Sequence, residues 1–334
     1  MVRIDMALQA GLAGGVGMSV AAVVLAVLCR RWRSGAEIRS FRRGFGAAAG
    51  QLGSSDAAVR LAGVYALVNL ADEMSAFDRR QQCIDVLCGY LRLPVARDPH
   101  DRAADEVRRT ILDALAERLQ AGAQLSWSRH SFDFRRAQFI DVDFAGAIFA
   151  GHSVAFDDAV FLGGYCGFAK SRFTGETVSF TGTRFESGTT SFGAAVFAAD
   201  RHAFDRAIFS GRTTMFGGAA FRSGQVSFAS ASFLAQSSTS FIGAVFSGAD
   251  VSFSRALFAS NKTAFDMAEF GEGGRVTFLG ASFVGDRTSF AWPRKWANVS
   301  VDWARQAALM PASVRPRRWP PLPANHAPAA TSTR

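Results

Sequence analysis

Phenylalanine recurs through residues 132–290, and from Phe149 onward the intervals alternate between seven and five positions, with two lengthened to eight. The intervals from Phe156 to Phe161, Phe168 and Phe173 are five, seven and five, and this stretch of the chain holds 28 of its 31 phenylalanines. Glycine, serine, threonine and charged residues fill most positions between them. An α-helix repeats every 3.6 residues and cannot keep one face through steps of five and seven. The pattern is an internal repeat of twelve residues, which predicts a β-solenoid.

A second series of small residues accompanies the phenylalanines. The residue two positions before each Phe is nearly always short, as in Ala147, Val154, Ala159, Cys166 and Ser171. Side chains at i and i−2 lie on one face of a strand, so each unit is predicted to point one large and one small group into the interior. The core phenylalanines predicted on this basis are Phe139, Phe144, Phe149, Phe156, Phe161, Phe180, Phe185, Phe204, Phe209, Phe228 and Phe233.

Three successive units resemble those of the pentapeptide-repeat family, in which a small residue stands two positions before a central Leu or Phe. They are Ala137-Gln138-Phe139, Val142-Asp143-Phe144 and Ala147-Ile148-Phe149. The resemblance covers about half of the chain and implies a mainly β fold, a right-handed four-sided β-helix. This chain departs from the family pattern because it uses only Phe at the centre and lengthens every second interval to seven.

The number of residues in one turn is either twelve or 24. Twelve residues at about 3.3 Å each enclose a tube too narrow for two Phe and two small groups in each layer, and overpacking is destabilising. We therefore predict 24 residues in each turn and roughly six to seven turns. Phe180 should stack on Phe204 and Phe185 on Phe209, about 4.8 Å apart, while Phe180 and Phe192 face each other within one layer. The two eight-residue intervals, after Phe233 and Phe270, are expected to be one-residue bulges.

The remaining segments have other patterns. Residues 36–122 carry apolar residues at helical spacing, as in Leu61, Val64, Val68 and Ala71, and predict an α-helical module of three or four helices. The β-helix is expected over residues 127–290, with its entry at Trp127–Phe134. Residues 291–310 are expected to form a C-terminal cap with helical potential from Val299, and the basic, Pro-rich residues 311–334 are expected to be disordered.

Residues 6–29 form an apolar run that is long enough to cross a bilayer as a helix. Arg30, Arg31 and Arg33 follow directly, so the positive-inside rule predicts an anchor over residues 1–30 and a cytoplasmic location for the rest of the chain. The alternative is a cleaved signal peptide. It is disfavoured because the basic residues lie on the wrong side of the run and no small-residue cleavage site follows.

The net charge of +9 belongs to the two flanks of the repeat. Residues 132–290 contain 13 Lys and Arg against 14 Asp and Glu. Some pentapeptide-repeat proteins mimic DNA and protect topoisomerases through a strongly acidic surface, and the nearly neutral repeat disfavours that alternative. The neutral repeat also gives no reason to expect nucleic acid as a partner.

Candidate chemistry is sparse, and no catalytic, cofactor-binding or metal-binding residue is predicted. The histidines His100, His130, His152, His202 and His326 lack metal-ligand spacing. His202 is unusual because it occupies a position that is small in neighbouring units, and we expect it to be hydrogen-bonded or turned outward. The carboxylates Asp141, Asp143, Asp157 and Asp158 are interpreted as a solvated bend. An enzyme built on a β-helix would need a polar cluster recurring on successive turns, so we predict a non-enzymatic, membrane-anchored scaffold with an unidentified protein partner.

Overall fold

The computed structural model describes residues 37–94, 102–236, 238–271 and 273–324. The chain divides into two compact units at Met74 and Ser75. Within the described ranges, no helix has the length and apolar character needed to cross a membrane. The anchor predicted over residues 6–29 lies outside the described residues.

The first unit contains a pair of packed helices. Residues 37–52 are helical, and α2 (Ala57–Glu73) follows after a short turn. The Asp56 carboxylate caps α2 by accepting a hydrogen bond of 2.8 Å from the backbone N–H of Ala58. Gly63 allows close contact between the two helices, because a Cβ at this position would lie 2.5 Å from the backbone nitrogen of Leu52. The apolar face predicted for residues 61–71 is therefore the face that packs.

The second unit begins with α3 (Phe77–Leu91) and α4 (Arg102–Leu119). Their apolar faces are buried, but the inward stripe of α4 is Val107, Ile111, Leu115 and Leu119, whereas Leu112 is only half-buried. Steps of four residues from Val107 define the buried face of α4. Both helices belong to the unit that contains the solenoid, so the predicted helical module is divided between α2 and α3.

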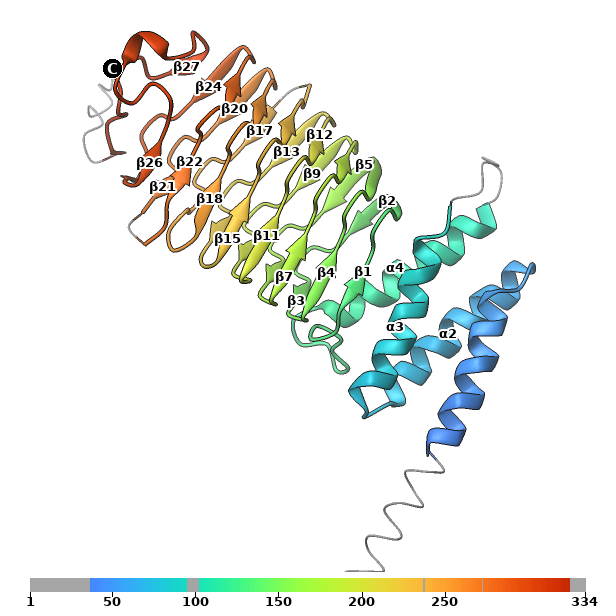
Figure 1. The fold of residues 1–334 in the computed structure, drawn as a ribbon. Coiled ribbons are helices and arrows are strands. Elements are labelled where there is room, and N and C mark those ends of the chain that lie inside the picture. Colours follow the sequence, from blue (N-terminus) through green and yellow to red (C-terminus); the bar gives the residue numbers. More distant parts are fainter. Residues whose placement is uncertain (1–36, 95–101, 237, 272, 325–334) are drawn as a thin grey trace, which may run out of the picture. The chain divides into compact units, whose positions relative to one another are not determined.

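The rest of the second unit is a parallel β-solenoid, whose strands stack turn upon turn (Figure 1). Four ladders of strands run along it, and we call them sides 1 to 4 in chain order. Side 1 comprises β1 (Phe132–Asp133), β4 (Ser153–Ala155), β7 (Thr177–Ser179), β11 (Arg201–Ala203), β15 (Gln225–Ser227), β18 (Asp250–Ser252), β22 (Val276–Thr277) and β26 (Val299–Ser300). Side 2 comprises β2 (Gln138–Asp143), β5 (Val160–Gly167), β8 (Arg184–Phe185), β12 (Ile208–Phe209), β16 (Ser232–Phe233), β19 (Leu257–Phe258) and β23 (Ser282–Phe283).

The other two sides complete each turn. Side 3 starts from the second halves of β2 and β5 and continues through β9 (Thr189–Ser191), β13 (Thr213–Met215), β17 (Ser238–Ser240), β20 (Lys262–Ala264), β24 (Arg287–Ser289) and β27 (Val314–Arg315). Side 4 comprises β3 (Ile148–Phe149), β6 (Arg172–Phe173), β10 (Val196–Phe197), β14 (Ala220–Phe221), a bridge at Val245, β21 (Glu269–Phe270) and β25 (Lys295–Trp296). The eight strands of side 1, from Phe132 to Ser300, correspond to about eight turns, whereas the six to seven predicted were counted from Phe134 to Phe290.

The stacking of the phenylalanine rings confirms the predicted turn length. The ring centroids of Phe180 and Phe204 are 4.8 Å apart with planes at 6°, and those of Phe185 and Phe209 are 4.7 Å apart at 4°. Phe192 instead meets Phe180 edge-on, at 5.7 Å and 88°. One turn is therefore 24 residues where the intervals are regular, and the two eight-residue intervals leave the ladders unbroken.

The C-terminal end of the solenoid differs from the expected helical cap and disordered tail. Val299–Ser300 is the strand β26, paired with β22, and only Ala307–Leu309 is helical, as the short 3₁₀ segment η1. Within residues 311–324, β27 pairs with β24, and Trp319 packs against the rings of Phe290, Trp296 and Trp303. The Trp side chains cover the last Phe layer, and this packing fixes the position of the proline-rich segment.

Candidate interaction surfaces

Stacked rings fill the interior of the solenoid. Each of the eleven predicted core phenylalanines has an exposed fraction of 0%. The solenoid phenylalanines form four columns, in which rings one turn apart stack with nearly parallel planes, as Phe180 does with Phe204. Rings of different columns meet edge-on, as Phe180 does with Phe192, or tilted, as Phe180 does with Phe185 at 42°. Offset stacking and edge-on contact are the arrangements that aromatic pairs prefer. Because these rings fill the interior, only the outward-facing residues of the solenoid can contact a partner.

His202 points into this interior. It occupies a valine column of side 1, between Val178 and Val226, and is 1% exposed. Its Nε2 accepts a hydrogen bond of 2.9 Å from the backbone N–H of Ala199, while Nδ1 has no hydrogen-bond partner among the described residues. Burial lowers the pKa of His202 to about 3. The imidazole is thus a neutral core side chain that lies away from the outer surface.

The cysteines of the described chain are likewise core residues. Cys83 and Cys88 lie on the buried face of α3, and Cys166 lies inside the solenoid. Burial raises the pKa of the Cys83 thiol to about 11 and raises the pKa values of Cys88 and Cys166 as well. Protonated thiols are poor nucleophiles and poor metal ligands. No group of three or more His, Cys, Asp or Glu within the described ranges could hold a metal ion.

Several outer carboxylates join one turn to the next, which the interpretation as a solvated bend had missed. Asp157 and Asp205 each accept a hydrogen bond from the hydroxyl of a serine one turn later, Ser179 and Ser227 respectively. Asp266 accepts from Ser289 in the same way. A signal for these contacts is present in the sequence, because each Asp directly follows a core Phe and its Ser lies 22 or 23 positions ahead. These carboxylates therefore have a structural role, since each one hydrogen-bonds to the next turn.

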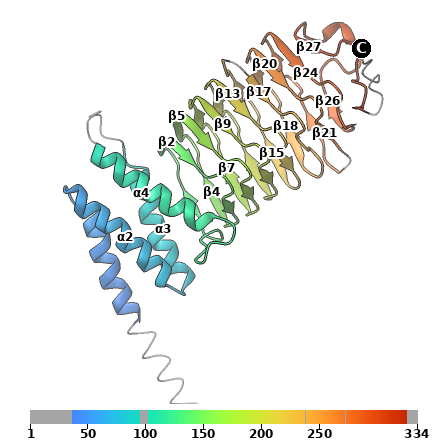
Figure 2. The same cartoon turned by 180° about the vertical axis from the view of Figure 1, so that it is seen from behind.

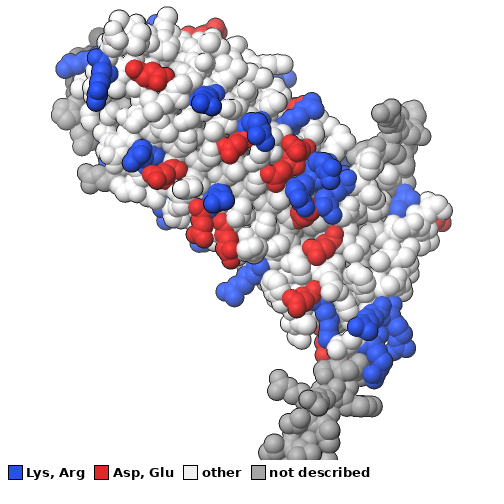
Figure 3. Space-filling view, in the orientation of Figure 1, with Lys and Arg blue, Asp and Glu red and all other residues white. Residues whose placement is uncertain are grey.

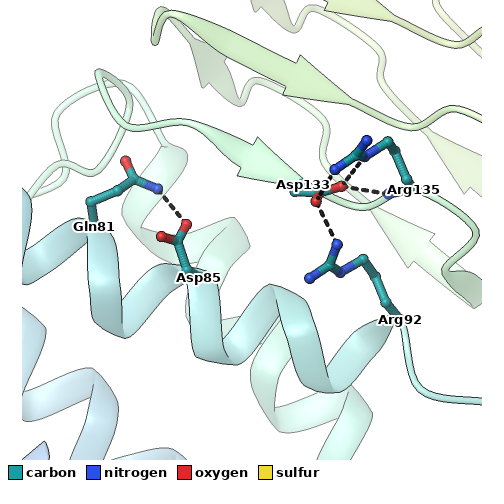
Figure 4. A network of polar contacts seen from close by, with 5 residues as sticks. All are labelled: Gln81, Asp85, Arg92, Asp133 and Arg135. Atoms are coloured by element: carbon teal, nitrogen blue, oxygen red, sulfur yellow. Dashed lines mark hydrogen bonds and ion pairs between the residues drawn. The ribbon is translucent and has the colours of Figure 1, made fainter.

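A polar network joins α3 to the first turn of the solenoid (Figure 4). The Gln81 side chain pairs with the backbone of Ser131, donating to its carbonyl at 2.8 Å and accepting from its N–H at 2.9 Å. Arg92 and Arg135 both contact the carboxylate of Asp133. The hydrogen bond from Arg135 is the main reason that the pKa of Asp133 lies below its ordinary value. The network holds the helix against β1 and so protects the edge of the first turn.

A groove runs between α4 and β2, and both elements are visible beside each other in the two ribbon views (Figures 1 and 2). Arg108 lies at its base, buried, and donates hydrogen bonds of 2.6 and 3.1 Å to the carbonyls of Leu91 and Gln138. Asp141 on the opposite wall accepts from the backbone N–H groups of Gly164 and Tyr165. The charged residues lining the groove are Asp105, Arg108, Arg109, Asp113, Asp141 and Asp143. Arg108 thus joins α4 to α3 and to β2, while Asp141 joins β2 to β5 of the next turn.

Charges of both signs are interspersed over the solenoid face in view (Figure 3). This agrees with the nearly equal numbers of acidic and basic residues in 132–290. Comparisons of the chain with protein-family models, with curated proteins and with solved structures found no match. The likeness to pentapeptide repeats therefore rests on two features alone, the parallel solenoid and its regularly spaced phenylalanines. Both features are compatible with a pentapeptide-repeat fold.

Proposed function

We propose that this chain is a non-enzymatic scaffold, anchored in the cell membrane through residues 6–29, that presents a right-handed, four-sided, pentapeptide-like solenoid to a protein partner on the cytoplasmic side. The observation that carries the proposal is the continuous set of Phe stacks inside a solenoid of about eight turns. Such a core makes each turn rest on its neighbours, and solenoids of this kind offer extended surfaces for binding proteins. The anchor follows from the apolar run and its basic C-terminal flank.

The anchor is tested by membrane extraction of the full chain. Met18→Arg places a charge in the middle of the apolar run, where an arginine costs about 2.5–3.5 kcal/mol of insertion free energy. The unchanged chain should stay with membranes after alkaline extraction, and the Met18→Arg chain should be released. Release of both proteins to the same extent would contradict the anchor.

The scaffold role is tested by cross-linking inside cells. A photoreactive amino acid is placed at outward positions of side 3 on successive turns, Thr189, Thr213 and Ser238, and at outward positions of side 1, Gln225 and Asp250. A scaffold surface should give the same cross-linked protein from successive turns of one side and a different pattern from the other side. Absence of any discrete product from both sides would argue against a protein partner on these surfaces.

A further inference from the structure

Three large apolar side chains are exposed on successive turns at the corner between sides 3 and 4. They are Ile242, Met267 and Trp292, with exposed fractions of 45%, 48% and 42%, and we call them the apolar ridge. Backbone hydrogen bonds from Gly243 to Asp266 and from Met267 to Ala291 place their corners directly one above another. The two preceding turns have only Gly or Ala at these positions, in Gly193-Ala194 and Gly217-Gly218. The ridge thus continues into a smooth, uncharged corner.

Exposed basic residues flank this corner at both ends. Lys170 occupies the same corner as Ala194, one turn earlier. Arg172 lies two positions after Lys170 in the chain, on side 4. At the other end Arg294 and Lys295 lie two and three positions after Trp292, and both are exposed. The Arg294 guanidinium extends back along the ridge, because a Cβ on Gly243 would lie 3.6 Å from its Nη2. The cations are therefore close to the apolar side chains.

The two carboxylates of this region have partners. Asp266 accepts hydrogen bonds from the Ser289 hydroxyl and from the backbone N–H of Ala291. Glu269 lies 3.8 Å from the Lys295 ammonium group and is half-buried. With four cations and two internally paired carboxylates, the corner has a net positive charge.

We infer that the apolar ridge, with Lys170, Arg172, Arg294 and Lys295, is a contact surface for an anionic lipid bilayer. Apolar and aromatic side chains gain free energy by entering the interfacial region of a bilayer, and tryptophan is enriched there. Lysine and arginine beside them attract anionic head groups within a Debye length of the surface. A second copy of the chain fits less well, because both ends of the corner are basic and a symmetric pairing would bring like charges together. This contact goes beyond the anchor over residues 6–29 and does not depend on it.

The test measures the environment of single positions in the full chain, reconstituted into vesicles. Cys29→Ser removes the one cysteine outside the described residues, since Cys83, Cys88 and Cys166 are buried. Met267→Cys then accepts an environment-sensitive fluorophore on the ridge. Leu279→Cys is the matched control, because Leu279 is also 48% exposed but lies at the corner after side 1. The vesicles contain either phosphatidylcholine alone or an equal mixture with phosphatidylglycerol.

The expected result is a blue shift of the label at position 267 and its quenching by brominated lipid, only in vesicles with phosphatidylglycerol, with no change at position 279. Charge reversal at Lys170, Arg172, Arg294 and Lys295 should abolish the shift while flotation of the chain with the vesicles is retained. If the chain floats but the label at 267 stays in water, the inference is overturned and the anchor stands. If the label is shielded without lipid and increasingly so at higher protein concentration, the ridge binds a second copy and the inference is overturned. A chain that does not float with either vesicle overturns both.

Discussion

Replacing one ring of the Phe stacks should weaken the whole solenoid, and Phe209→Ala is the most informative change. Phe209 is fully buried, with its ring centroid 4.7 Å from that of Phe185 and 4.9 Å from that of Phe233. Truncation of a buried Phe to Ala costs about 3–5 kcal/mol of unfolding free energy, through lost transfer energy and the cavity left behind. Two stacked pairs are lost as well, each contributing about 0.5–1.5 kcal/mol beyond burial. The expected loss lies in the upper half of the range, about 4–5 kcal/mol.

The assay is thermal and urea unfolding followed by circular dichroism, with Ser210→Ala as the control. A loss of this size should lower Tm by about 10–20 °C, given a shift of about 2–4 °C per kcal/mol for chains of this size. Ser210 is half-buried, and its N–H bond to the Phe185 carbonyl is a backbone contact that the substitution retains, so its effect should stay within about 0.5 kcal/mol. Equal effects of the two substitutions would refute the assigned facing of the strand.

Three further predictions follow from single positions. Thr263→Val should be neutral or stabilising, because the buried Thr263 hydroxyl has no hydrogen-bond partner among the residues that the structure describes. Thr239→Val should instead destabilise by about 1 kcal/mol through loss of the 2.7 Å bond to Ser260, and chemical denaturation compares the two variants. Asp205→Ala should cost about 1–3 kcal/mol, since the Ser227 hydroxyl loses its acceptor and the backbone N–H of Ala229 keeps only the Ser227 oxygen; unchanged unfolding would contradict a structural role for Asp205. A reporter active only outside the cell, fused after Arg334, should stay silent, and a strong signal would contradict the proposed cytoplasmic orientation.

The solenoid could be predicted because the same short unit recurs many times in the sequence. Intervals of five and seven identify the inward positions, and the volume of four Phe and four small groups in each layer leaves 24 residues as the workable turn. Side-chain volume, together with the resemblance to a four-sided β-helix, therefore distinguished Phe204 from Phe192 as the neighbour stacked on Phe180, and the ring geometry agrees.

The ends of the solenoid could not be predicted in the same way. Each end is a single, non-repeated arrangement of segments that are far apart in the sequence. Gln81 and Ser131 are 50 positions apart, and their pairing depends on how α3 docks on β1. Trp319 follows a basic, proline-rich stretch that has the composition of a disordered tail, yet its ring closes the last layer against Phe290 and Trp296. The apolar ridge was also missed, because Ile242, Met267 and Trp292 are 25 positions apart and share a surface only through the turn length.

His202 should make the stability of the solenoid depend on pH below neutrality. Its folded-state pKa is about 3 because of burial, against an ordinary value of 6.5. Below pH 6.5 the unfolded chain binds a proton that the folded chain does not, so unfolding free energy falls as pH falls and is unaffected above about pH 7. At pH 5 the loss is about 2 kcal/mol, from about 1.4 kcal/mol per pH unit.

The matched variant for this effect is His202→Val, which restores the residue of the neighbouring turns at Val178 and Val226. It removes the titrating group and the unpartnered Nδ1, but it also leaves the N–H of Ala199 without its acceptor. The absolute stability at pH 7 is therefore less informative than its change between pH 7 and pH 5. His130, which is also buried with a lowered pKa, is present in both proteins and cancels in the comparison. Parallel pH profiles of urea unfolding for the two proteins would show that His202 is not held neutral inside the solenoid.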